Sequence, residues 1–278
     1  MLETLRQGPT NVLQEPGPPT KVQGSGWKLK TIRHAVPWLQ RYSLSGVWRV
    51  LRRAGLKLRT AQGQHYSPDA DYAPKVAHLL ACVQETACHR DTTVLLFMDE
   101  MGYYCWPEPT TVWVATAPAA LPHTDRQGVK QQQWRIIGVL NALSGQVDYL
   151  DGYVVGRAKV IAMYKQMIQR YSWAARIYVV QDNWNIHQHD AVLEALSTMP
   201  TIEPVWLPTY APWLNPMEKL WRWLRQDVLK MHRLAAQWSE LRQRVNTFLD
   251  QFAHGSSELL CYVGLAGKGK LAQAIRAL

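Results

Sequence analysis

The sequence predicts a mixed α/β sheet flanked by helices, preceded by a small all-helical module. Two observations predict this fold class. Apolar strand-like runs between residues 94 and 155 follow one another with no room for helices, which predicts antiparallel neighbours. Later strand-like runs alternate with helical segments, which implies parallel strands joined by helical crossovers. Helices are therefore expected on both faces of the sheet.

The N-terminal part is predicted to hold a leader and a helix-turn-helix. Residues 1–26 are rich in proline and glycine and are expected to form a flexible leader. Residues 27–66 are expected to form the helical module. One helix is predicted from Lys28 to Val36, and a second from the N-cap Ser43 to about Ala54.

Positive charge is concentrated in this part of the chain. The net charge is +10, and residues 1–60 contain 11 lysines and arginines against 2 acidic residues, whereas the other 218 contain 20 against 19. A basic second helix suits the major groove of double-stranded DNA. The alternative is a basic tail that is merely exposed to solvent. The residues expected to contact DNA are Arg49, Arg52, Arg53, Lys57 and Arg59.

The rest of the chain is predicted to form a linker, an α/β domain and a C-terminal helical segment. Residues 67–92 are expected to link the modules through a helix near Pro74–Thr86, residues 93–232 to form the α/β domain, and residues 233–278 to form a C-terminal helical segment. The predicted strands are Val94–Asp99, Thr111–Ala117, Trp134–Leu143, Gln146–Val155, Ile177–Gln181 and Pro204–Leu207. The predicted helices are Ala158–Tyr171, Asp190–Thr198 and one beginning at Pro216.

The composition points to a reduced, cytoplasmic protein. No apolar run approaches the roughly 18 residues of a membrane span, and residues 1–26 lack a signal-peptide pattern, so no membrane partner is expected. The four cysteines form no CxxC pair, which disfavours a zinc site or a disulfide framework.

Two acidic residues follow apolar strands in the same way. Asp99 ends the run Val94–Met98, and Asp182 ends the run Ile177–Gln181. Ligands gather at the carboxyl ends of strands in open α/β sheets, although Asp is also common at ordinary strand-to-turn junctions. Glu100 is expected to point elsewhere than Asp99, because consecutive strand side chains point to opposite faces.

A third acid, Glu218, lies at the start of a predicted helix. With Asn215 as N-cap and Pro216 at the first helical position, Glu218 would fall at the third, which is the capping-box spacing. Its carboxylate is equally suited to reach a metal bound at the strand ends. Three converging acids can hold two divalent metals, and two metals can cut a phosphodiester.

The segments Phe97–Glu100, Val180–Asn183 and Tyr210–Trp221 resemble bacterial insertion-sequence transposases of the mariner superfamily. The resemblance covers roughly residues 27–260. It implies an RNase H-like catalytic domain in which Asp99, Asp182 and Glu218 form an Asp-Asp-Glu triad that binds two Mg²⁺ or Mn²⁺ ions.

The same resemblance implies a DNA transposase that binds transposon ends, cleaves DNA and joins the 3′ ends to target DNA. A homodimer on the DNA and a nucleoid-associated location in a bacterial cytoplasm are expected with it. The alternatives are a non-cutting DNA-binding protein of transposon origin and a metal-dependent nuclease without strand transfer. Such transposases commonly carry two helix-turn-helix units, and only one is predicted here, which is the pattern of a truncated or split copy.

Three other patterns in the sequence resemble functional sites. His187 and His189 form a His-x-His near Asp182, and a structural role or a DNA contact is favoured because Mg²⁺ prefers oxygen ligands. Residues 264–270 resemble part of a phosphate-binding loop but lack the following Ser or Thr, which favours a basic tail. Trp106 and Trp184 lie near the acids in sequence and could stack on unpaired bases.

Overall fold

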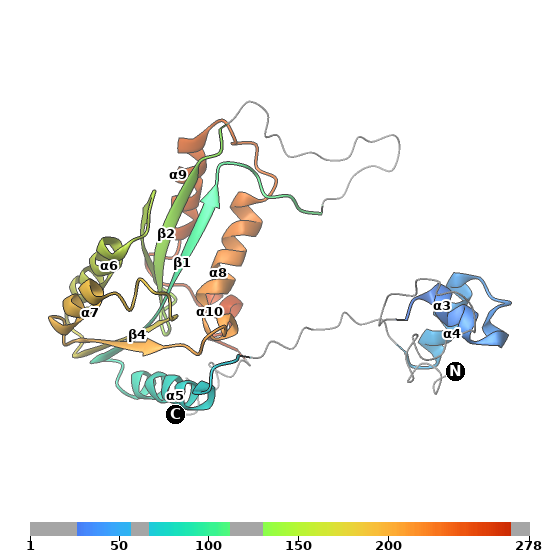
Figure 1. The fold of residues 1–278 in the computed structure, drawn as a ribbon, viewed down its shortest axis with the longest axis horizontal. Helices are drawn as coiled ribbons and strands as arrows, with labels where there is room; N and C mark the ends of the chain where they lie inside the picture. The colour runs from blue at the N-terminus through green and yellow to red at the C-terminus, as the bar shows by residue number, and fades with distance from the viewer. Residues whose placement is uncertain (1–26, 57–66, 112–129, 268–278) are drawn as a thin grey trace. The chain divides into compact units, whose positions relative to one another are not determined.

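The computed structural model describes residues 27–56, 67–111 and 130–267 (Figure 1). The chain divides into two compact units, Met1–Gln64 and His65–Leu278. Each unit is described by itself below.

The first unit contains the two predicted helices. Helix α3 (Leu29–Ala35) and a 3₁₀ turn, η1 (Pro37–Leu39), precede helix α4 (Leu44–Arg53). The Ser43 side chain caps α4 by accepting a hydrogen bond from the Gly46 N–H at 3.2 Å. Gly55 follows α4 with a φ of +79°, a left-handed conformation that favours glycine, as predicted from the sequence. The buried core of this unit consists of Ile32, Val36, Leu39, Val47 and Leu51.

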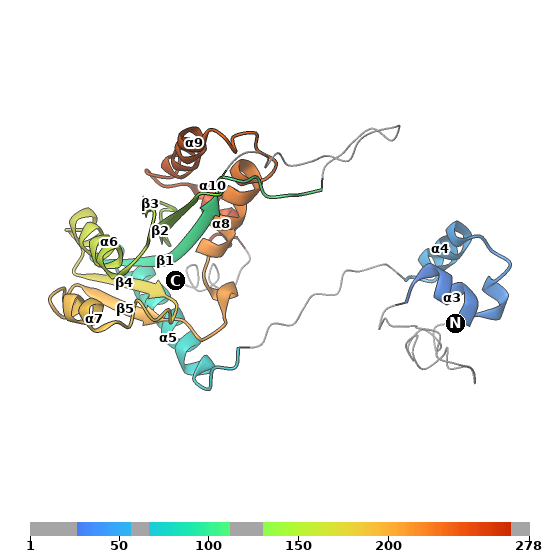
Figure 2. The same ribbon diagram turned by 45° about the horizontal axis from the view of Figure 1, so that its top comes forward.

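The second unit is built on a five-stranded mixed sheet in the order β3-β2-β1-β4-β5 (Figures 1 and 2). The strands are β1 (Thr93–Tyr104), β2 (Gln133–Asn141), β3 (Val147–Gly152), β4 (Arg176–Gln181) and β5 (Ile202–Trp206). Strands β1, β2 and β3 pair antiparallel, whereas β4 is parallel to β1 and β5 is parallel to β4. The predicted mixture of antiparallel and parallel pairs is therefore confirmed.

The end of the first strand was predicted wrongly. The sequence predicted that the first strand ends at Asp99, but β1 continues to Tyr104 because β2 pairs with it along that whole length. The buried side chains of Met101 and Tyr103 alternate with more exposed ones, which is the pattern of a half-buried strand. The predicted strand Thr111–Ala117 lies outside the described residues apart from Thr111, which is in no strand.

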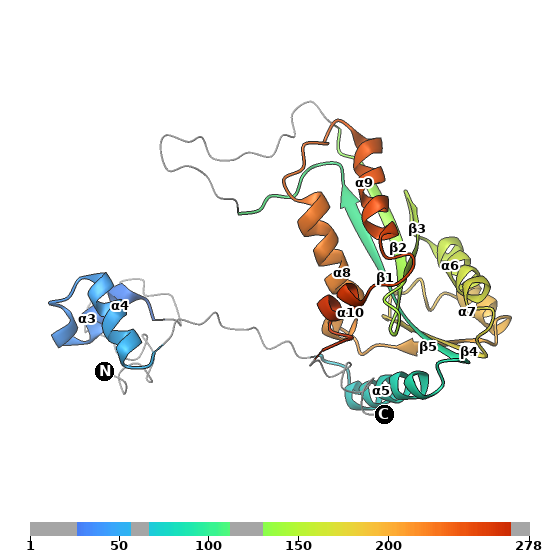
Figure 3. The ribbon, with the colours of Figure 1, turned by 180° about the vertical axis from the view of Figure 1, so that it is seen from behind.

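Helices cover both faces of the sheet (Figures 2 and 3). Helices α5 (Tyr72–Cys88), α8 (Met217–Leu224), α9 (Trp238–Asp250) and α10 (Ser257–Val263) share the hydrophobic core of one face. Helices α6 (Arg157–Arg170) and α7 (Asp190–Ser197) cover the other face. Along β1, Phe97 belongs to the first core and Met98 to the second. Asp99 therefore faces α8, and Glu100 faces the layer of α6 and α7.

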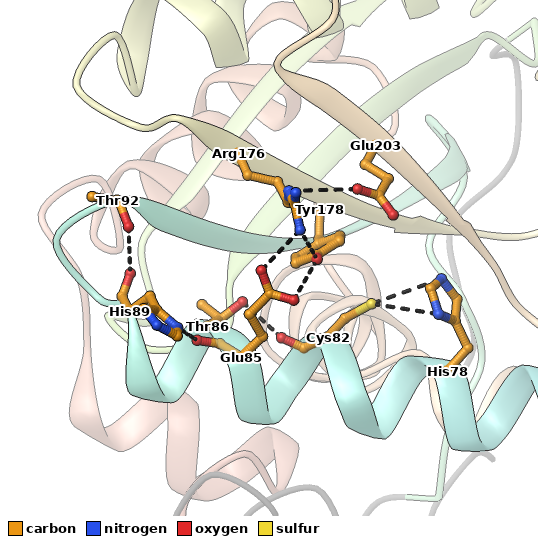
Figure 4. A network of polar contacts seen from close by, with 9 residues as sticks. All are labelled: His78, Cys82, Glu85, Thr86, His89, Thr92, Arg176, Tyr178 and Glu203. Atoms are coloured by element: carbon orange, nitrogen blue, oxygen red, sulfur yellow. Dashed lines mark hydrogen bonds and ion pairs between the residues drawn. The ribbon is translucent and has the colours of Figure 1, made fainter.

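A polar network fixes the C-terminal half of α5 to the sheet (Figure 4). Glu85 accepts hydrogen bonds from the Arg176 guanidinium at 2.9 Å and from the Tyr178 hydroxyl at 2.8 Å. Burial, together with the hydrogen bond to Glu85, raises the pKa of Tyr178 to about 12, so the phenol keeps the proton that it donates. Arg176 also lies 3.6 Å from Glu203 on β5, so one cation joins α5 to two strands.

Within the described residues, no helix combines the length and the apolar character needed to cross a membrane.

Candidate active site

Asp99 lies where the parallel part of the sheet ends. Strand β1 pairs with β4 only as far as Phe97, which lies opposite Val180, whereas its pairing with β2 continues through Asp99. The two parallel strands therefore separate next to Asp99. Such a point, beside the carboxyl end of a parallel strand, is where open α/β sheets place their ligands.

A tryptophan and a glycine position the Asp99 carboxylate. The Trp221 indole N–H on α8 donates to Asp99 Oδ2 at 3.0 Å. Gly138 lies opposite Asp99 on β2, and a Cβ at this position would come within 2.9 Å of the Trp221 ring and 3.0 Å of Met217. The missing side chain at residue 138 is what allows α8 to bring its indole to the carboxylate.

The surroundings of Asp99 oppose its ionisation. Burial raises the pKa of Asp99 well above its usual range, and the negative charges of Glu100, Glu218 and Asp182 raise the pKa further. Four carboxylates thus repel one another electrostatically at one edge of the sheet. A bound cation is the ligand that relieves such repulsion.

Asp182 directly follows β4, as the sequence predicted. Its Oδ1 accepts a hydrogen bond from the Trp184 backbone N–H at 3.0 Å, which holds the chain in a tight turn. The side chain of Asp182 is 55% exposed. Its second carboxylate oxygen therefore remains open to a ligand from solvent.

Glu218 is the second residue of α8 and is exposed. The capping-box alternative does not form, because the Asn215 backbone N–H donates to the Pro212 carbonyl at 3.0 Å instead of to the Glu218 carboxylate. Asn215 itself is buried and ties α8 to the sheet. Its Nδ2 donates to the Met98 carbonyl at 3.0 Å, and its Oδ1 accepts from the Met217 N–H at 3.1 Å. The start of α8 is thereby fixed to the residue preceding Asp99.

The three predicted acids line one cleft of about 520 Å³, whose walls come from the segments after β4 and β5 and from the start of α8. They do not form a compact cluster in this structure. Among the described residues, the metal-binding side chains whose ligand atoms all lie within 4.8 Å of one another are Glu100, Asp182 and His187. The structure thus brings Asp99, Asp182 and Glu218 to the same cleft without placing their oxygens at a common point.

Glu100 lies closer to the acids than the sequence predicted. It points to the opposite face from Asp99, as expected, but its Oε1 lies 3.3 Å from His187 Nε2, which in turn lies 3.7 Å from Asp182 Oδ1. Asp182 follows a strand end and can therefore be approached from both faces of the sheet. The His187 side chain is only 1% exposed. No local pattern in the sequence indicates this contact, because it joins segments far apart along the chain.

The donor atoms around the cleft fit a divalent metal ion. Asp99, Asp182 and Glu218 offer the carboxylate oxygens that Mg²⁺ and Mn²⁺ prefer. Burial and then neighbouring negative charge raise the pKa of Asp99, and a bound cation would offset that charge. The imidazole of His187 is a less suitable ligand for Mg²⁺ than these oxygens, so a supporting role beside Asp182 fits it better.

The basic helix α4 presents its arginines to solvent. Arg49, Arg52 and Arg53 are all exposed, as the sequence predicted, and the Arg52 guanidinium lies 5.7 Å from the centre of the exposed Trp48 ring. Arginine and an aromatic ring on one exposed helix face suit a nucleic-acid backbone. The predicted contacts Lys57 and Arg59 lie outside the described residues.

The other sequence patterns place residues at a helix cap, at a helix end and in the cleft. His189 caps α7 by accepting a hydrogen bond from the Ala191 N–H at 3.2 Å, and it contacts Arg157 at 3.0 Å. Gly264 ends α10 in a left-handed conformation, and residues 268–270 lie outside the described part of the chain. Trp184 lines the cleft, as its place in the sequence suggested.

Comparison with known proteins identifies a family. Residues 94–242 match the DDE superfamily endonuclease family. The chain is 24% identical over 204 residues to the insertion element IS630 uncharacterized 39 kDa protein of Shigella sonnei. That match covers 73% of this chain and 57% of the relative, so the chain spans little more than half of the relative's length. These matches confirm the resemblance to insertion-sequence transposases.

Solved structures show the same fold. The Mos1 transposase paired-end complex with left transposon end matches with a TM-score of 0.59 and 16% identity, covering 95% of this chain and 81% of that one. The mariner Mos1 paired-end complex with Mg matches with a TM-score of 0.60 and 15% identity, covering 95% and 80%. The predicted RNase H-like architecture, with helices on both faces of a mixed sheet and an N-terminal helical module, is confirmed.

The first prediction concerns the glycine behind Asp99. We expect Gly138→Ala to lower the free energy of unfolding by about 1–3 kcal/mol, because the added Cβ would overpack against Trp221. The change is measured by denaturant unfolding. Gly102→Ala on β1 is the matched control, since the nearest atom to its Cβ would be the flexible end of Gln133 at 3.3 Å. Equal stability of the two variants would contradict the assigned packing.

A second prediction follows from the raised pKa of Asp99. At pH 7–8 in EDTA, we expect Asp99→Asn to increase the free energy of unfolding, because it removes a charge that the folded state disfavours. As pH falls through the raised pKa, the wild-type carboxyl takes up a proton and gains the same stability, so the difference should shrink.

Asp91→Asn is the matched control for this measurement, because Asp91 is exposed just before β1. Thermal unfolding across the pH range measures both variants. A destabilised Asp99→Asn variant at pH 7–8 would show that the four acids do not oppose one another's charge.

Proposed function

The chain belongs to the DDE superfamily of endonucleases, and on this premise we propose that it is a DNA transposase. It binds transposon ends, cleaves the DNA with two divalent metal ions, Mg²⁺ or Mn²⁺, and joins the 3′ ends to target DNA. The observation that supports this proposal most is the shared cleft of Asp99, Asp182 and Glu218. No side chain is needed as a nucleophile, because water and then the freed 3′-hydroxyl can attack phosphorus.

The three acids divide the work of holding the metal ions. Asp99 would be the most fixed ligand, because the Trp221 indole holds its carboxylate. Asp182 and Glu218, which are more exposed, would supply further carboxylate oxygens from the same cleft. Metal ions held by these acids would supply Lewis-acid chemistry that activates an attacking oxygen and stabilises a leaving one. His187, beside Asp182, helps to orient that carboxylate.

Two arginine side chains beside the cleft are suited to contact DNA. A second hollow of about 300 Å³ continues from Asp99 and Glu218 along β1 and α8, and it is lined by Arg222 and Arg225. Arg225 is held in place by Glu108 and by the Gly102 carbonyl. Arg222 is exposed one turn after Glu218 and is suited to a phosphate next to the cleavage site.

Binding and assembly follow from the same proposal. The exposed arginines of α4 supply the main contacts with double-stranded DNA, together with Lys57 and Arg59. The protein acts as a homodimer on paired transposon ends, in a bacterial cytoplasm and associated with the nucleoid. The IS630 relative from Shigella sonnei supports a bacterial insertion element as the source of those ends.

The decisive experiment removes one acid. We expect Asp182→Asn to reduce Mg²⁺-dependent cleavage of DNA carrying the element's inverted repeats by more than about 100-fold, since even partners outside the ligand shell contribute 10- to 100-fold. Binding to the same duplex should stay within about 2-fold, because the basic helix is untouched. Gel assays of cleavage and binding measure the two effects.

Asp190→Asn is the matched control, because Asp190 is an exposed acid at the start of α7. Wild-type cleavage by Asp182→Asn would refute the triad. Wild-type cleavage without joining of 3′ ends would identify a nuclease, and specific binding without cleavage would identify a non-cutting DNA-binding protein.

A further prediction concerns the basic module. We expect changing Arg52 and Arg53 together to Ala to flatten the slope of log affinity against log salt by up to about 2, because each phosphate contact contributes roughly 0.9. The slope is measured by fluorescence anisotropy with a labelled duplex. The control is a double change at Lys165 and Arg244, which are exposed on α6 and α9. Equal losses for the two pairs would show that α4 is not the anchoring surface.

A further inference from the structure

The loop that leads from β5 to α8 forms one wall of the cleft. We call residues 207–211 the cleft loop, because every one of them lines the cleft with the three acids. Tyr210 in this loop is 77% exposed and has a φ of 54°, an unusual backbone conformation for a residue with a side chain. Such a conformation persists only where the surrounding contacts fix it.

One set of contacts comes from the segment after β4. The Asn183 side chain donates to the Leu207 carbonyl at 2.7 Å, and the Leu207 N–H donates to the Gln181 carbonyl at 2.9 Å. These bonds join the beginning of the cleft loop to the residues on either side of Asp182. They leave the middle of the loop to be held from elsewhere.

The second set comes from residues 67–72, which precede and begin α5. Asp69 Oδ2 accepts a hydrogen bond from the Thr209 N–H at 2.8 Å, and the Ser67 hydroxyl donates to the Thr209 carbonyl at 2.5 Å. Both backbone polar groups of Thr209 are thus satisfied by residues about 140 positions away in sequence. The Tyr72 hydroxyl also accepts from the Trp213 indole N–H at 3.3 Å, just beyond the loop.

The Asp69 carboxylate is itself fixed by further hydrogen bonds. Its side chain is only 8% exposed, Lys75 donates to the same Oδ2 at 2.8 Å, and the Asp71 N–H donates to Oδ1 at 2.9 Å. The Lys75 ammonium and the two backbone N–H groups hold the pKa of Asp69 well below its usual range. The carboxylate therefore stays ionised, and its charge-assisted hydrogen bond to Thr209 is stronger than a neutral one.

We propose that Ser67 and Asp69 form a clamp that positions the cleft loop, and through it Glu218, opposite Asp99 and Asp182. The clamp residues act through the loop and do not touch DNA or metal, so they are positioning residues. They are also the first described residues that follow the basic module along the chain. The segment that follows the helical module in the chain therefore also positions the cleft loop. The catalytic part of this inference rests on the proposed function.

The test uses the full-length chain with Asp69→Ala. In metal-free protein, we expect hydrogen exchange of the Thr209 and Tyr210 amides to rise about 10-fold, which is the effect of losing a hydrogen bond of ordinary strength. In cleavage assays, we expect the Mg²⁺ concentration for half-maximal rate to rise by about 10-fold, as for other outer partners of metal ligands, while excess Mg²⁺ restores much of the rate.

Two control variants separate positioning from general stability. Asp71→Ala removes the same side-chain type two residues away, where the side chain makes no capping bond to α5. Glu85→Gln weakens the attachment at the other end of α5, to Arg176 and Tyr178 (Figure 4). We expect Glu85→Gln to lower the thermal midpoint without changing loop exchange or the Mg²⁺ requirement. Ser67→Ala, which removes one of the two bonds to Thr209, replaces Asp69→Ala if that variant does not fold.

Each outcome decides a separate point. Unchanged exchange at residues 209 and 210 in the clamp variant would overturn the clamp. A loosened loop with an unchanged Mg²⁺ requirement would overturn its role in positioning Glu218. If Glu85→Gln changed loop exchange and the Mg²⁺ requirement as much as Asp69→Ala does, both effects would result from lost stability and not from the clamp. If the wild-type protein does not cleave, the proposed function fails, and the exchange measurement alone still decides whether the clamp exists.

Discussion

The cleft depends on keeping one carboxylate, Asp99, half-buried beside three other acids. Burial and neighbouring negative charge both oppose its ionisation. A carboxyl group must nevertheless be ionised to bind a metal ion. A bound cation would therefore be needed to stabilise the ionised form of Asp99. The Trp221 indole is a fixed donor to this carboxylate, at 3.0 Å. Gly138 leaves room for the Trp221 ring, and Asn215 fixes the start of α8 to the sheet. Both residues therefore place the indole beside Asp99.

The segments that carry the acids are held by side-chain to backbone hydrogen bonds. Asn215 bonds to the residue before Asp99, Asn183 bonds to the cleft loop, and Asp69 bonds to the middle of that loop. Side chains of like charge would move apart if their backbones were free. Fixing the backbone from three directions keeps the acids facing one cleft at a cost in stability, which is the usual balance at a preorganised site.

Local pattern in the sequence predicted most of the fold and selected three acids that line one cleft, and it failed where distant segments decide the outcome. The end of β1 was placed at Asp99 because two acids follow an apolar run, whereas pairing with β2 carries the strand to Tyr104. The capping box, one of two roles left open for Glu218, does not form because a 3₁₀ turn before α8 uses the Asn215 N–H. The Glu100–His187 contact and the clamp at Asp69 join residues far apart in sequence, so no spacing rule could indicate them.

In the proposed function, the division of charge between the two units makes DNA binding and DNA cleavage separate physical problems. Nearly all of the net positive charge lies in residues 1–60, whereas three carboxylates line the cleft and a fourth, Glu100, lies near Asp99. A phosphate backbone is attracted to the exposed arginines of α4 from a distance and is repelled by the acids at short range. Attraction by exposed charges weakens with salt, whereas the half-buried Asp99 is screened less. Metal ions are therefore required in the proposed reaction for two reasons: they supply the chemistry, and they reverse the sign of the field that a phosphate meets in the cleft.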